Sequence, residues 1–542
     1  MCIRVINWKL LAIFVSKKIN ATLKSRACAH IPLYMNGLKQ IKTALISVYH
    51  KDNLNEVIHL LNNFGVKIFS TGGTLKFIED CGVEAEPVEE LTGYPSILGG
   101  RVKTLHPKIF GGLLARRNNE NDLFQLEEYK IPEIDLVIVD LYPFEETVAS
   151  GASEQEIIEK IDIGGVSLIR AAAKNFRDVL VVSSRNQYKT LIDLLDTNNG
   201  STTIDQRREF ALEAFNMTSH YDTAIFSYFA SESSPVAFKQ SIQGVKVLRY
   251  GENPHQKGMF YGDFNALFQQ LHGKEVSYNN LLDIDAAINL IAEFEEPTIG
   301  ILKHNNACGL ASRKTLTQAW IDALAGDPVS AFGGVIISNR PIDAETANEM
   351  DKLFFEVIIA PNYSEDALKT ITSKKNRIVL LSKKSAFHNM QFRSILNGAL
   401  AQDRDSKTES VEDMKPVTLV TPSDDQYADL VFANKIVKHS KSNTIVLAKN
   451  RQLIASGVGE TSRVDALKHA IEKAKSFGFN LKDAVMASDA FFPFADSIEI
   501  ADKEGICAVV QPGGSVRDQE TIDYCNNHNI AMVFTGVRHF KH

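Results

Sequence analysis

Short apolar runs alternate with helical patterns through the first part of the chain, and this alternation constrains the fold most strongly. Residues 42–49 and 66–69 form two such runs, and residues 136–141 form a third. Asp52 stands where it can cap the helix expected after the first run. Apolar residues then recur at helical spacing, at Leu54, Val57, Ile58 and Leu61. Strands that alternate with helices predict an α/β fold around a mainly parallel sheet.

Length and composition exclude several classes of protein. A chain of 542 residues is too long for a single core, so we expect at least two domains. The net charge of -7 gives no general affinity for nucleic acid, and no apolar run approaches the roughly 18 residues of a membrane span. We therefore expect neither a nucleic-acid nor a membrane partner. The six cysteines lack CxxC spacing, which fits a reducing, cytoplasmic location.

Three segments of the chain differ in character. Residues 1–37 carry six basic side chains and no acidic one. They form either an organellar leader or an over-long start ahead of Met35; we favour the second and expect poor order. The SESSP stretch at 231–235 resembles a linker. We therefore expect one domain over residues 38–235 and another over 236–542.

Two glycine-containing segments of the first domain are candidates for binding an anion. Residues 70–74 (STGGT) follow a predicted strand and precede a helix, which presents backbone N–H groups to a phosphate, although glycine often serves packing alone. Residues 99–108 contain three cations, a histidine and a hydroxyl. On an extended segment Arg101 and Lys103 point to the same side and form a two-cation clamp, with Thr104 as a further donor. The alternative is a solvated basic edge strand.

A third glycine turn lies further along the first domain. Ser153 and Glu156 form a capping box, and Gly164-Gly165 precedes a helix whose N-terminus could also face an anion. Lys174 ends this helix. It is either a reactive lysine or a surface residue that suits the helix dipole.

In the second domain Lys303 and His304 end an apolar run, residues 298–302. A neighbouring cation disfavours the imidazolium form, so His304 is a candidate general base. The alternative is a solvent-exposed lysine beside a capping histidine. Cys308 lies four residues further on, so a cysteine-nucleophile hydrolase with His304 as base is a rival interpretation. A catalytically inactive nucleotide sensor is another.

The ordered motifs SVYHK, STGGT, LTGYPSILGGRVKTLHPKI, DLYPF and IDIGGVSLIRAAAKN resemble the cyclohydrolase half of the bifunctional enzymes that combine AICAR transformylase with IMP cyclohydrolase. The resemblance implies a methylglyoxal-synthase-like domain with a parallel sheet. It places the nucleotide phosphate against Thr71, Gly72, Gly73, Thr74, Arg101, Lys103 and Thr104. It also implies that Lys51, Asp162 and Ile163 line the pocket and that Lys174 transfers the proton. The sequence departs from many relatives at Tyr49-His50 and from some at Asp140.

Motifs of the second domain, among them LRYGENPHQ, KHNNACG, DPVSAFGG, GVGETSR and SDAFFPFAD, resemble the transformylase half of the same family. That half implies two cytidine-deaminase-like subdomains, although the sequence itself has no visible repeat. AICAR would contact Arg249, Tyr250, His304, Gly333, Asn443 and Arg463, with Phe332 against its base. The folate would contact Phe491, Asp496, Ser515, Val516 and Arg538. The departures at Ala307 and Glu356 preserve the local chemistry.

The resemblance implies two consecutive reactions. A formyl group passes from the cosubstrate 10-formyltetrahydrofolate to AICAR, with Lys303 and His304 as catalytic residues. The product, FAICAR, then closes to IMP with loss of water. The HxE and PCxxC zinc signature of deaminases is absent, so we expect no catalytic metal. The family resemblance also implies a homodimer.

Overall fold

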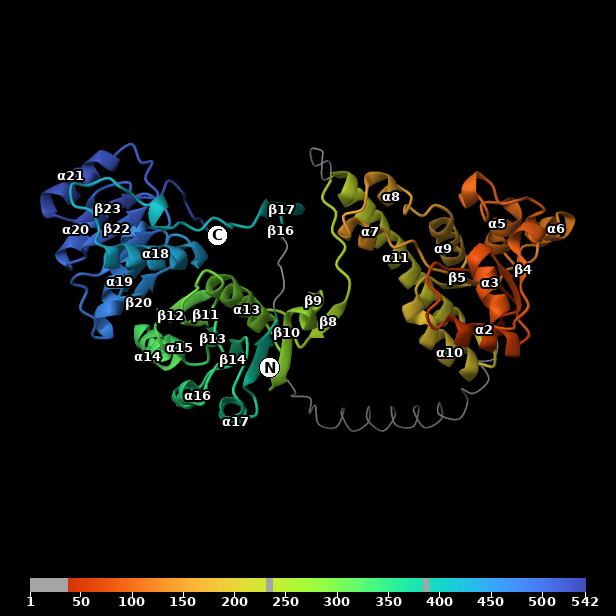
Figure 1. Ribbon diagram of the computed structural model, residues 1–542, viewed down its shortest axis with the longest axis horizontal. Helices are drawn as coiled ribbons and strands as arrows, with labels where there is room; N and C mark the ends of the chain where they lie inside the picture. Colours follow the sequence, from red (N-terminus) through yellow and green to blue (C-terminus); the bar gives the residue numbers. More distant parts are fainter. Residues whose placement is uncertain (1–37, 231–236, 384–388) are drawn as a thin grey trace, which may run out of the picture. The chain divides into compact units, whose positions relative to one another are not determined.

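The computed structural model describes residues 38–230, 237–383 and 389–542 (Figure 1). Two compact units divide the chain, Met1–Ser241 and Ile242–His542. The predicted extension at 1–37 and the predicted linker at 231–235 lie outside the described residues. Within the described residues, no helix is long and apolar enough to cross a membrane.

The first unit is built on a parallel sheet with the strand order β4-β3-β2-β5-β6. In the register of this sheet, Ala44 pairs with Ile68 on one side and with Leu136 on the other. The strands are β2 (Thr43–Ser47), β3 (Lys67–Ser70), β4 (Glu86–Pro87), β5 (Leu136–Val139) and β6 (Leu180–Val182), while β1 (Lys39–Gln40) and β7 (Ser201–Thr202) pair separately. The sequence therefore predicted the parallel sheet correctly.

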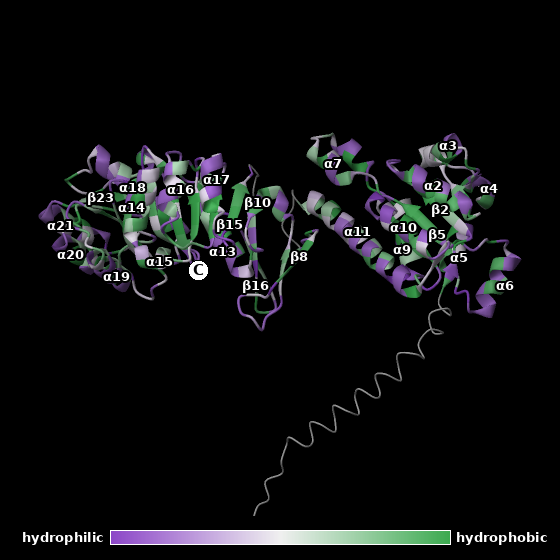
Figure 2. Ribbon diagram, turned by 90° about the horizontal axis from the view of Figure 1, so that it is seen from below, coloured by the Kyte–Doolittle hydropathy of each residue, from purple (hydrophilic) through white to green (hydrophobic). Residues whose placement is uncertain are grey.

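Both faces of this sheet are buried. Leu45 and Val137 belong to one apolar core, and Ile46 and Ile138 belong to the core on the opposite face. Figure 2 shows β2 and β5 as apolar strands. The helices of this unit are α2 (Leu54–Asn63), α3 (Gly72–Asp80), α4 (Val88–Thr92), α5 (Pro107–Leu114), α6 (Glu120–Glu128), α7 (Phe144–Ala149), α8 (Glu154–Ile158), α9 (Gly164–Lys174), α10 (Tyr188–Thr197) and α11 (Ile204–Ala230).

Strand order determines where a ligand can bind in this unit. The chain proceeds outward from β2 through β3 to β4, and the later strands β5 and β6 lie on the other side of β2. The order therefore reverses between β2 and β5. At such a switch point the loops after neighbouring strands separate and leave a crevice at the carboxyl ends of the strands.

Of the two helix caps predicted in the first unit, one is confirmed and one is wrong. Ser153 and Glu156 form the predicted capping box at the start of α8. The prediction that Asp52 caps α2 is wrong, because the N-cap is Asn53 in a left-handed conformation, with φ of 60°. Asp52 instead pairs with Arg185 at 3.0 Å.

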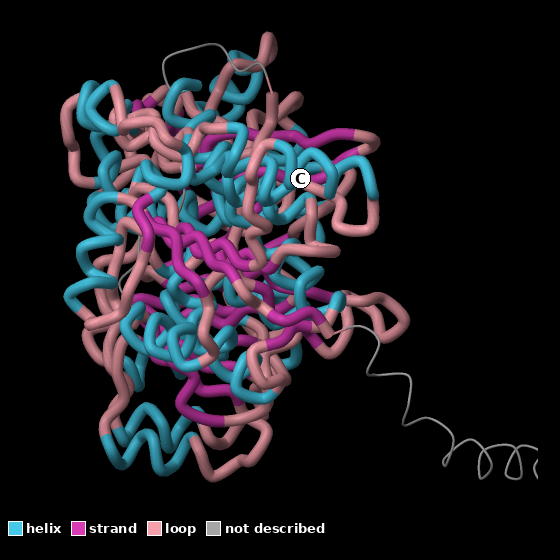
Figure 3. The backbone as a smooth tube through the Cα atoms, turned by 90° about the vertical axis from the view of Figure 1, so that its right-hand side faces the viewer, coloured by secondary structure: helices cyan, strands magenta, loops and turns pink. Residues whose placement is uncertain are grey.

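The second unit contains a twelve-stranded mixed sheet within the described residues, and its strand order is nearly symmetric. The order β15-β14-β13-β11-β12 meets β20-β19-β21-β22-β23, with β10 and β18 as antiparallel edges. Each half has two parallel and two antiparallel pairings, because one strand, β11 or β19, runs opposite to the other four. Figure 3 colours the strands of both units magenta and their helices cyan. The predicted architecture of two similar subdomains is confirmed by this repeated order.

From α13 to β15 and again from α18 to β23, strands and helices follow the same order, except for the additional short helix α15. The strands are β8 (Val245–Leu248), β9 (Gly258–Tyr261), β10 (Phe268–His272), β11 (Thr298–Lys303), β12 (Asn306–Ser312), β13 (Val335–Ser338), β14 (Val357–Ala360), β15 (Ile378–Ser382), β16 (Met390–Ile395), β17 (Gly398–Asp403), β18 (Lys415–Pro416), β19 (Ile445–Lys449), β20 (Gln452–Gly457), β21 (Val485–Ser488), β22 (Ala508–Gln511) and β23 (Ala531–Phe534). The helices are α12 (Phe264–Leu267), α13 (Tyr278–Ile291), α14 (Leu316–Gly326), α15 (Pro328–Ala331), α16 (Ala344–Met350), α17 (Glu365–Ile371), α18 (Asp424–His439), α19 (Arg463–Ser476), α20 (Asp496–Lys503) and α21 (Asp518–His528).

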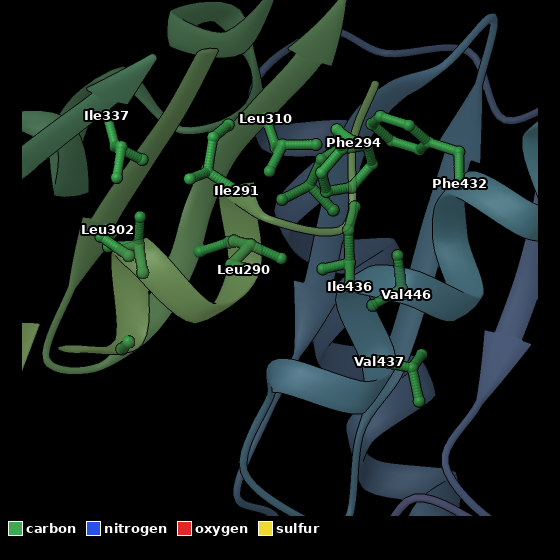
Figure 4. Close-up of a cluster of buried hydrophobic side chains, with 14 of the residues drawn as sticks. Leu290, Ile291, Phe294, Leu302, Leu310, Ile337, Phe432, Ile436, Val437 and Val446 are labelled. Atoms are coloured by element: carbon green, nitrogen blue, oxygen red, sulfur yellow. The ribbon is translucent and has the colours of Figure 1, made fainter. Parts of the chain in front are cut away.

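The two halves share one apolar core. Leu290 and Ile291 of α13 meet Ile436 and Val437 of α18 on the same face of the sheet, with Phe294 against Phe432 (Figure 4). Separate cores lie on the opposite face, one against α14, α16 and α17 and one against α19, α20 and α21. The central sheet is therefore buried on both faces, and its polar chemistry is confined to strand ends.

Close contact between strand and helix makes a glycine necessary in β12. A Cβ on Gly309 would lie 2.1 Å from the carbonyl oxygen of Ala323 in α14. Gly309→Ala must therefore push α14 away from the sheet, at a cost of about 1–3 kcal/mol. We expect a lower melting temperature of the second unit in differential scanning calorimetry. Gly398→Ala in β17 is the matched control, because nothing lies within 4 Å of its Cβ position. Equal melting temperatures for both variants would contradict this packing.

Candidate functional site

A cavity of about 630 Å³ lies at the carboxyl ends of β2, β3 and β5 in the first unit, at the switch point of the sheet. Its lining includes most of the residues that the sequence predicted for this site: Lys51, Thr71, Gly73, Thr74, Arg101, Lys103, Thr104, Asp162 and Ile163. Gly72 borders the same group, since a Cβ there would lie 3.6 Å from Lys103 Nζ. The fold thus brings together residues that are far apart in the sequence.

The cationic side of the cavity differs from the predicted extended clamp. Arg101 follows a 3₁₀ turn, Leu98–Gly100, and has helical φ and ψ, so the extended geometry is wrong. Arg101 pairs with Glu159, while Lys103 passes over Gly100. A Cβ on Gly100 would lie 2.7 Å from Lys103 Cε, and its φ of 91° also requires glycine. Both cations still line the cavity.

Two helices begin at this cavity. No side chain caps α3. The Thr74 N–H donates to the carbonyl oxygen of Thr71, whereas the N–H groups of Gly72 and Gly73 have no partner within the helix and can face an anion. At α9 the Asp162 carboxylate accepts a hydrogen bond from the N–H of Gly165 at 2.6 Å. Burial raises the pKa of Asp162, although that hydrogen bond opposes the shift. The cavity therefore offers positive helix ends together with a partly buried carboxyl group.

Burial shifts the pKa values of two further groups of the cavity, Lys51 and Tyr142. Lys51 donates hydrogen bonds to the carbonyl oxygens of Val48 and Tyr49, at 2.7 and 2.8 Å. Burial lowers the pKa of Lys51, which brings its proton exchange nearer to neutral pH. Burial also raises the pKa of Tyr142, so its hydroxyl stays protonated as a donor.

Tyr49, His50 and Asp140, which were expected to differ from the usual family residues, contact one another. The carboxylate of Asp140 accepts hydrogen bonds from the backbone N–H groups of Tyr49 and His50, and lies 3.0 Å from His50 Nδ1. Tyr49 packs edge-on against Tyr142, with ring centroids 5.6 Å apart, and Lys160 Nζ lies 5.1 Å from the Tyr49 ring. These residues therefore form one connected group, of which Tyr49, Asp140 and Tyr142 line the cavity.

Lys174 does not join this group. It is the last residue of α9, whereas the cavity lies at the first residues of that helix. An eleven-residue helix spans about 15 Å, and the Lys174 side chain is exposed. Lys174 therefore does not line the cavity of its own chain, and its role in proton transfer stays a prediction. Sequence reasoning assigned no role to Tyr49, Tyr142 or Glu159, although the DLYPF motif contains Tyr142.

In the second unit Lys303 and His304 lie at a tight turn between β11 and β12. His304 and Asn305 both have positive φ, 49° and 65°, and the Asn305 N–H donates to Asp283 of α13 at 2.6 Å. The Lys303 ammonium donates to the carbonyl oxygen of Phe332, beside Gly333. The structure therefore brings Lys303, Phe332 and Gly333 together and presents His304 to solvent.

The same turn recurs in the other half of the sheet. Asn450 and Arg451 join β19 to β20 with φ of 52° and 54°, and their N–H groups donate to Asp429 of α18. Lys449 occupies the position equivalent to Lys303. The second turn therefore preserves the geometry but has Asn450 where the first turn has His304.

Asn443 and Arg463 form a second cluster. Arg463 donates to Asn443 Oδ1 at 3.0 Å and to the buried carboxylate of Asp489 at 2.7 Å. The loop that carries Asn443 contacts the His304 turn, because the Lys441 N–H donates to Asn306 Oδ1 at 3.1 Å. These hydrogen bonds connect the predicted AICAR residues of both halves.

The remaining predicted residues lie on surrounding loops. Arg249 stacks on Tyr250, with 5.7 Å to the ring centroid, and the following turn is tied to α13 by Asn279, which donates to the carbonyl oxygen of Glu252. The predicted folate residues Phe491, Asp496, Ser515, Val516 and Arg538 lie in loops after β21, β22 and β23 or at the start of α20. Phe492, between them in sequence, is fully buried and belongs to the core.

Cys308 does not fit a nucleophilic role. Its side chain is buried and donates to the carbonyl oxygen of Ile301. Burial raises the pKa of the thiol to about 12, so the reactive thiolate is scarce near neutral pH. The rival interpretation as a cysteine hydrolase therefore loses its nucleophile.

Comparison with known families agrees with this arrangement. Residues 172–473 match the family model described as AICARFT/IMPCHase bienzyme, and residues 53–167 match the MGS-like domain. The chain belongs to the family of AICARFT/IMPCHase bienzymes.

Curated relatives cover nearly the whole chain. The bifunctional purine biosynthesis protein PurH of Bacteroides thetaiotaomicron is 64% identical over 94% of this chain and 100% of that protein. The proteins of the same name from Acetivibrio thermocellus and Aquifex aeolicus are 46% and 47% identical, over 93% and 92% of this chain and 100% of each relative. A solved structure titled "Crystal structure of ForH" is 34% identical over 36% of this chain and 100% of its own, with a TM-score of 0.32.

The buried thiol yields a direct prediction. At pH 8 we expect iodoacetamide to leave Cys308 unmodified in the folded protein, because a thiol with a pKa of about 12 is almost entirely protonated. Cys81, which is partly exposed, is the internal comparison. Peptide mass spectrometry gives the modified fraction of each residue. Modification of Cys308 as fast as Cys81, or loss of activity in Cys308→Ser, would restore the hydrolase interpretation.

Proposed function

We propose that the two units divide the two reactions of the family. Residues 38–235 form the cyclohydrolase domain, and residues 236–542 form the transformylase domain. The observation that carries this division is the cavity at the switch point of the first sheet, which gathers nine of the predicted nucleotide contacts. The Lys303-His304 turn lies in the second unit, in a separate sheet.

Formyl transfer takes place at the turn between β11 and β12. The cosubstrate is 10-formyltetrahydrofolate, and the 5-amine of AICAR attacks its formyl carbon. His304 removes a proton from the amine, directly or through the neighbouring carboxamide. Lys303 stabilises the oxyanion and returns a proton to the folate nitrogen as the old C–N bond breaks. The rigid two-residue turn supports this assignment because Asp283 fixes its backbone.

The substrates contact residues that surround this turn. AICAR binds Arg249, Tyr250, Phe332, Gly333, Asn443 and Arg463. The folate binds Phe491, Asp496, Ser515, Val516 and Arg538. The hydrogen bond between Lys441 and Asn306 supports a shared site, because it joins the Asn443 loop to the His304 turn.

Ring closure takes place in the cavity of the first unit. The carboxamide nitrogen of FAICAR attacks the formyl carbon, a C–N bond forms, and water leaves to give IMP. The reaction is intramolecular, so positioning supplies much of the rate. Lys103, Arg101, Thr104 and the start of α3 hold the phosphate. Lys51 transfers the proton, and the pKa shift that burial causes in this lysine supports that role.

The chain acts as a cytoplasmic homodimer without a catalytic metal. The hairpin of β16 and β17 supports the dimer, because every residue of both strands is exposed. Met390 and Leu400 are among its exposed apolar residues. A two-stranded hairpin is only marginally stable by itself, and contact with a second copy would bury these residues.

Substitutions in the turn test the transformylase assignment. Lys303→Ala and His304→Ala should each lower the kcat of formyl transfer by about 10²- to 10⁴-fold, because each removes a group that moves a proton. Cyclisation of FAICAR by the same variants should be unchanged. Lys449→Ala is the matched control, since Lys449 holds the equivalent position in the second half. Near-normal formyl transfer in both test variants would refute the assignment.

Substitutions in the cavity test the cyclohydrolase assignment. Lys103→Met should raise the KM for FAICAR about 10- to 100-fold through loss of a charged hydrogen bond to phosphate. Lys51→Met should instead lower kcat. Lys189→Met on α10 serves as the control. Steady-state cyclisation rates distinguish the two effects, and a Lys174→Met variant with the larger loss of kcat would return proton transfer to that residue.

A further inference from the structure

The C-terminal segment of the second unit, residues 535–542, is tied to two parts of the proposed transformylase site. Lys541 exchanges two hydrogen bonds with Ser442, next to Asn443: Ser442 N–H donates to the Lys541 carbonyl at 2.9 Å, and Lys541 N–H donates to Ser442 Oγ at 3.0 Å. His539 N–H donates to the carbonyl oxygen of Asp489, whose carboxylate binds Arg463. Arg538 lies on the same segment, with its guanidinium 4.4 Å from the Phe540 ring centroid.

His539 anchors this segment inside the protein. Its side chain is 2% exposed, and each ring nitrogen faces a different carboxylate. Nδ1 lies 2.6 Å from Asp405 Oδ2, and Nε2 lies 2.9 Å from Glu409 Oε2. An ionised carboxylate can only accept hydrogen bonds, so both nitrogens must donate. With both carboxylates ionised, this geometry is satisfied by the doubly protonated imidazolium.

The other groups near His539 do not balance the negative charge of Glu409. On α18, Asn434 donates to the same Oε2 of Glu409 at 2.9 Å, whereas Lys438 is engaged by Glu293 and Thr408. Within the described residues Glu409 Oε1 has no hydrogen-bond partner. Asp489 faces His539 through its backbone carbonyl, and its own charge is paired with Arg463. Asp405 is half-exposed, and the neighbouring cations Arg538 and Lys541 are exposed.

We propose that His539, held as an imidazolium between Asp405 and Glu409, is a positioning residue for formyl transfer that fixes Arg538 and the Asn443 loop. The proposal rests on the proposed roles of Asn443 and Arg538 in substrate binding. His539 itself touches neither substrate. Its effect is transmitted through the hydrogen bonds of its own segment to Ser442 and Asp489.

Loss of a proton from His539 breaks this arrangement. The neutral ring has a single N–H, so one of the two carboxylates loses its donor. If that carboxylate is Glu409, a buried charge is left uncompensated, which is strongly unfavourable. The segment must then shift to admit water, and Arg538 and the Asn443 loop shift with it.

The direction of the pH effect follows from the same contacts. Burial alone lowers the pKa of His539, but the hydrogen bonds and charges of Glu409 and Asp405 outweigh it and raise the pKa above its ordinary value. A raised pKa in the folded protein stabilises the anchored segment at low pH, and this stabilisation is lost as the pH rises through that value. Formyl transfer should therefore decline on the alkaline side, whereas cyclisation in the first unit should not follow.

The test compares the pH profiles of both activities in one protein preparation. His539→Gln should lower kcat/KM for formyl transfer about 10- to 100-fold at pH 7, mainly through KM, because misplaced binding groups reduce rates by such factors. Glu409→Gln removes one of the charges that favour imidazolium. The formyl-transfer activity of this variant should therefore begin to decline at a lower pH than that of the wild type. FAICAR cyclisation serves as the internal control. His528→Gln, an exposed histidine paired with Asp502, serves as the matched variant.

Two outcomes would overturn the proposal. The first is an alkaline limb of formyl transfer that is the same in the wild type, His539→Gln and Glu409→Gln. The second is a loss of cyclisation activity and of thermal stability over the same rise in pH that reduces formyl transfer, which would mean general unfolding. If Arg538→Ala and Asn443→Ala also retained normal formyl transfer, the proposed binding site itself would be wrong, and this result distinguishes the two failures.

Discussion

Strands buried on both faces leave only their ends for polar chemistry, and both units depend on this constraint. In the first unit the parallel strands end together at the cavity, where Thr71 and Asp140 follow β3 and β5. In the second unit the His304 turn ends β11 within a sheet covered on both faces. The cores thereby hold reactive groups rigidly, since a strand end cannot move without disturbing the packing around it.

Much of the fold could be predicted because its periodicity is local. Strands β2, β3 and β5 follow apolar runs, and the glycine turn of residues 70–74 does precede a helix. Features that depend on tertiary contacts could not be predicted. Arg101 adopts a turn rather than an extended conformation, and Lys174 ends a helix whose other end forms the cavity. Motif order alone does not reveal which end of a helix faces a site.

The repeat in the second unit was invisible in the sequence for a physical reason. The two turns share a left-handed backbone and a helix carboxylate, Asp283 or Asp429, but different side chains occupy the turns themselves. Backbone geometry can thus persist while chemistry differs. Similarly, Tyr49, His50 and Asp140 looked like separate departures from the family, yet one carboxylate binds the other two residues. Such a link between residues can be recognised only when their contacts in the folded protein are known.

In the proposed division of labour, one chain carries two consecutive reactions, one in each unit. The most direct measurement mixes the purified protein with AICAR and 10-formyltetrahydrofolate and follows tetrahydrofolate and IMP together. Both products should form in equal final amounts, with IMP after a lag while FAICAR accumulates. Tetrahydrofolate without IMP would contradict the role of the cavity in the first unit. Bound AICAR with neither product would contradict catalysis altogether and favour a nucleotide sensor.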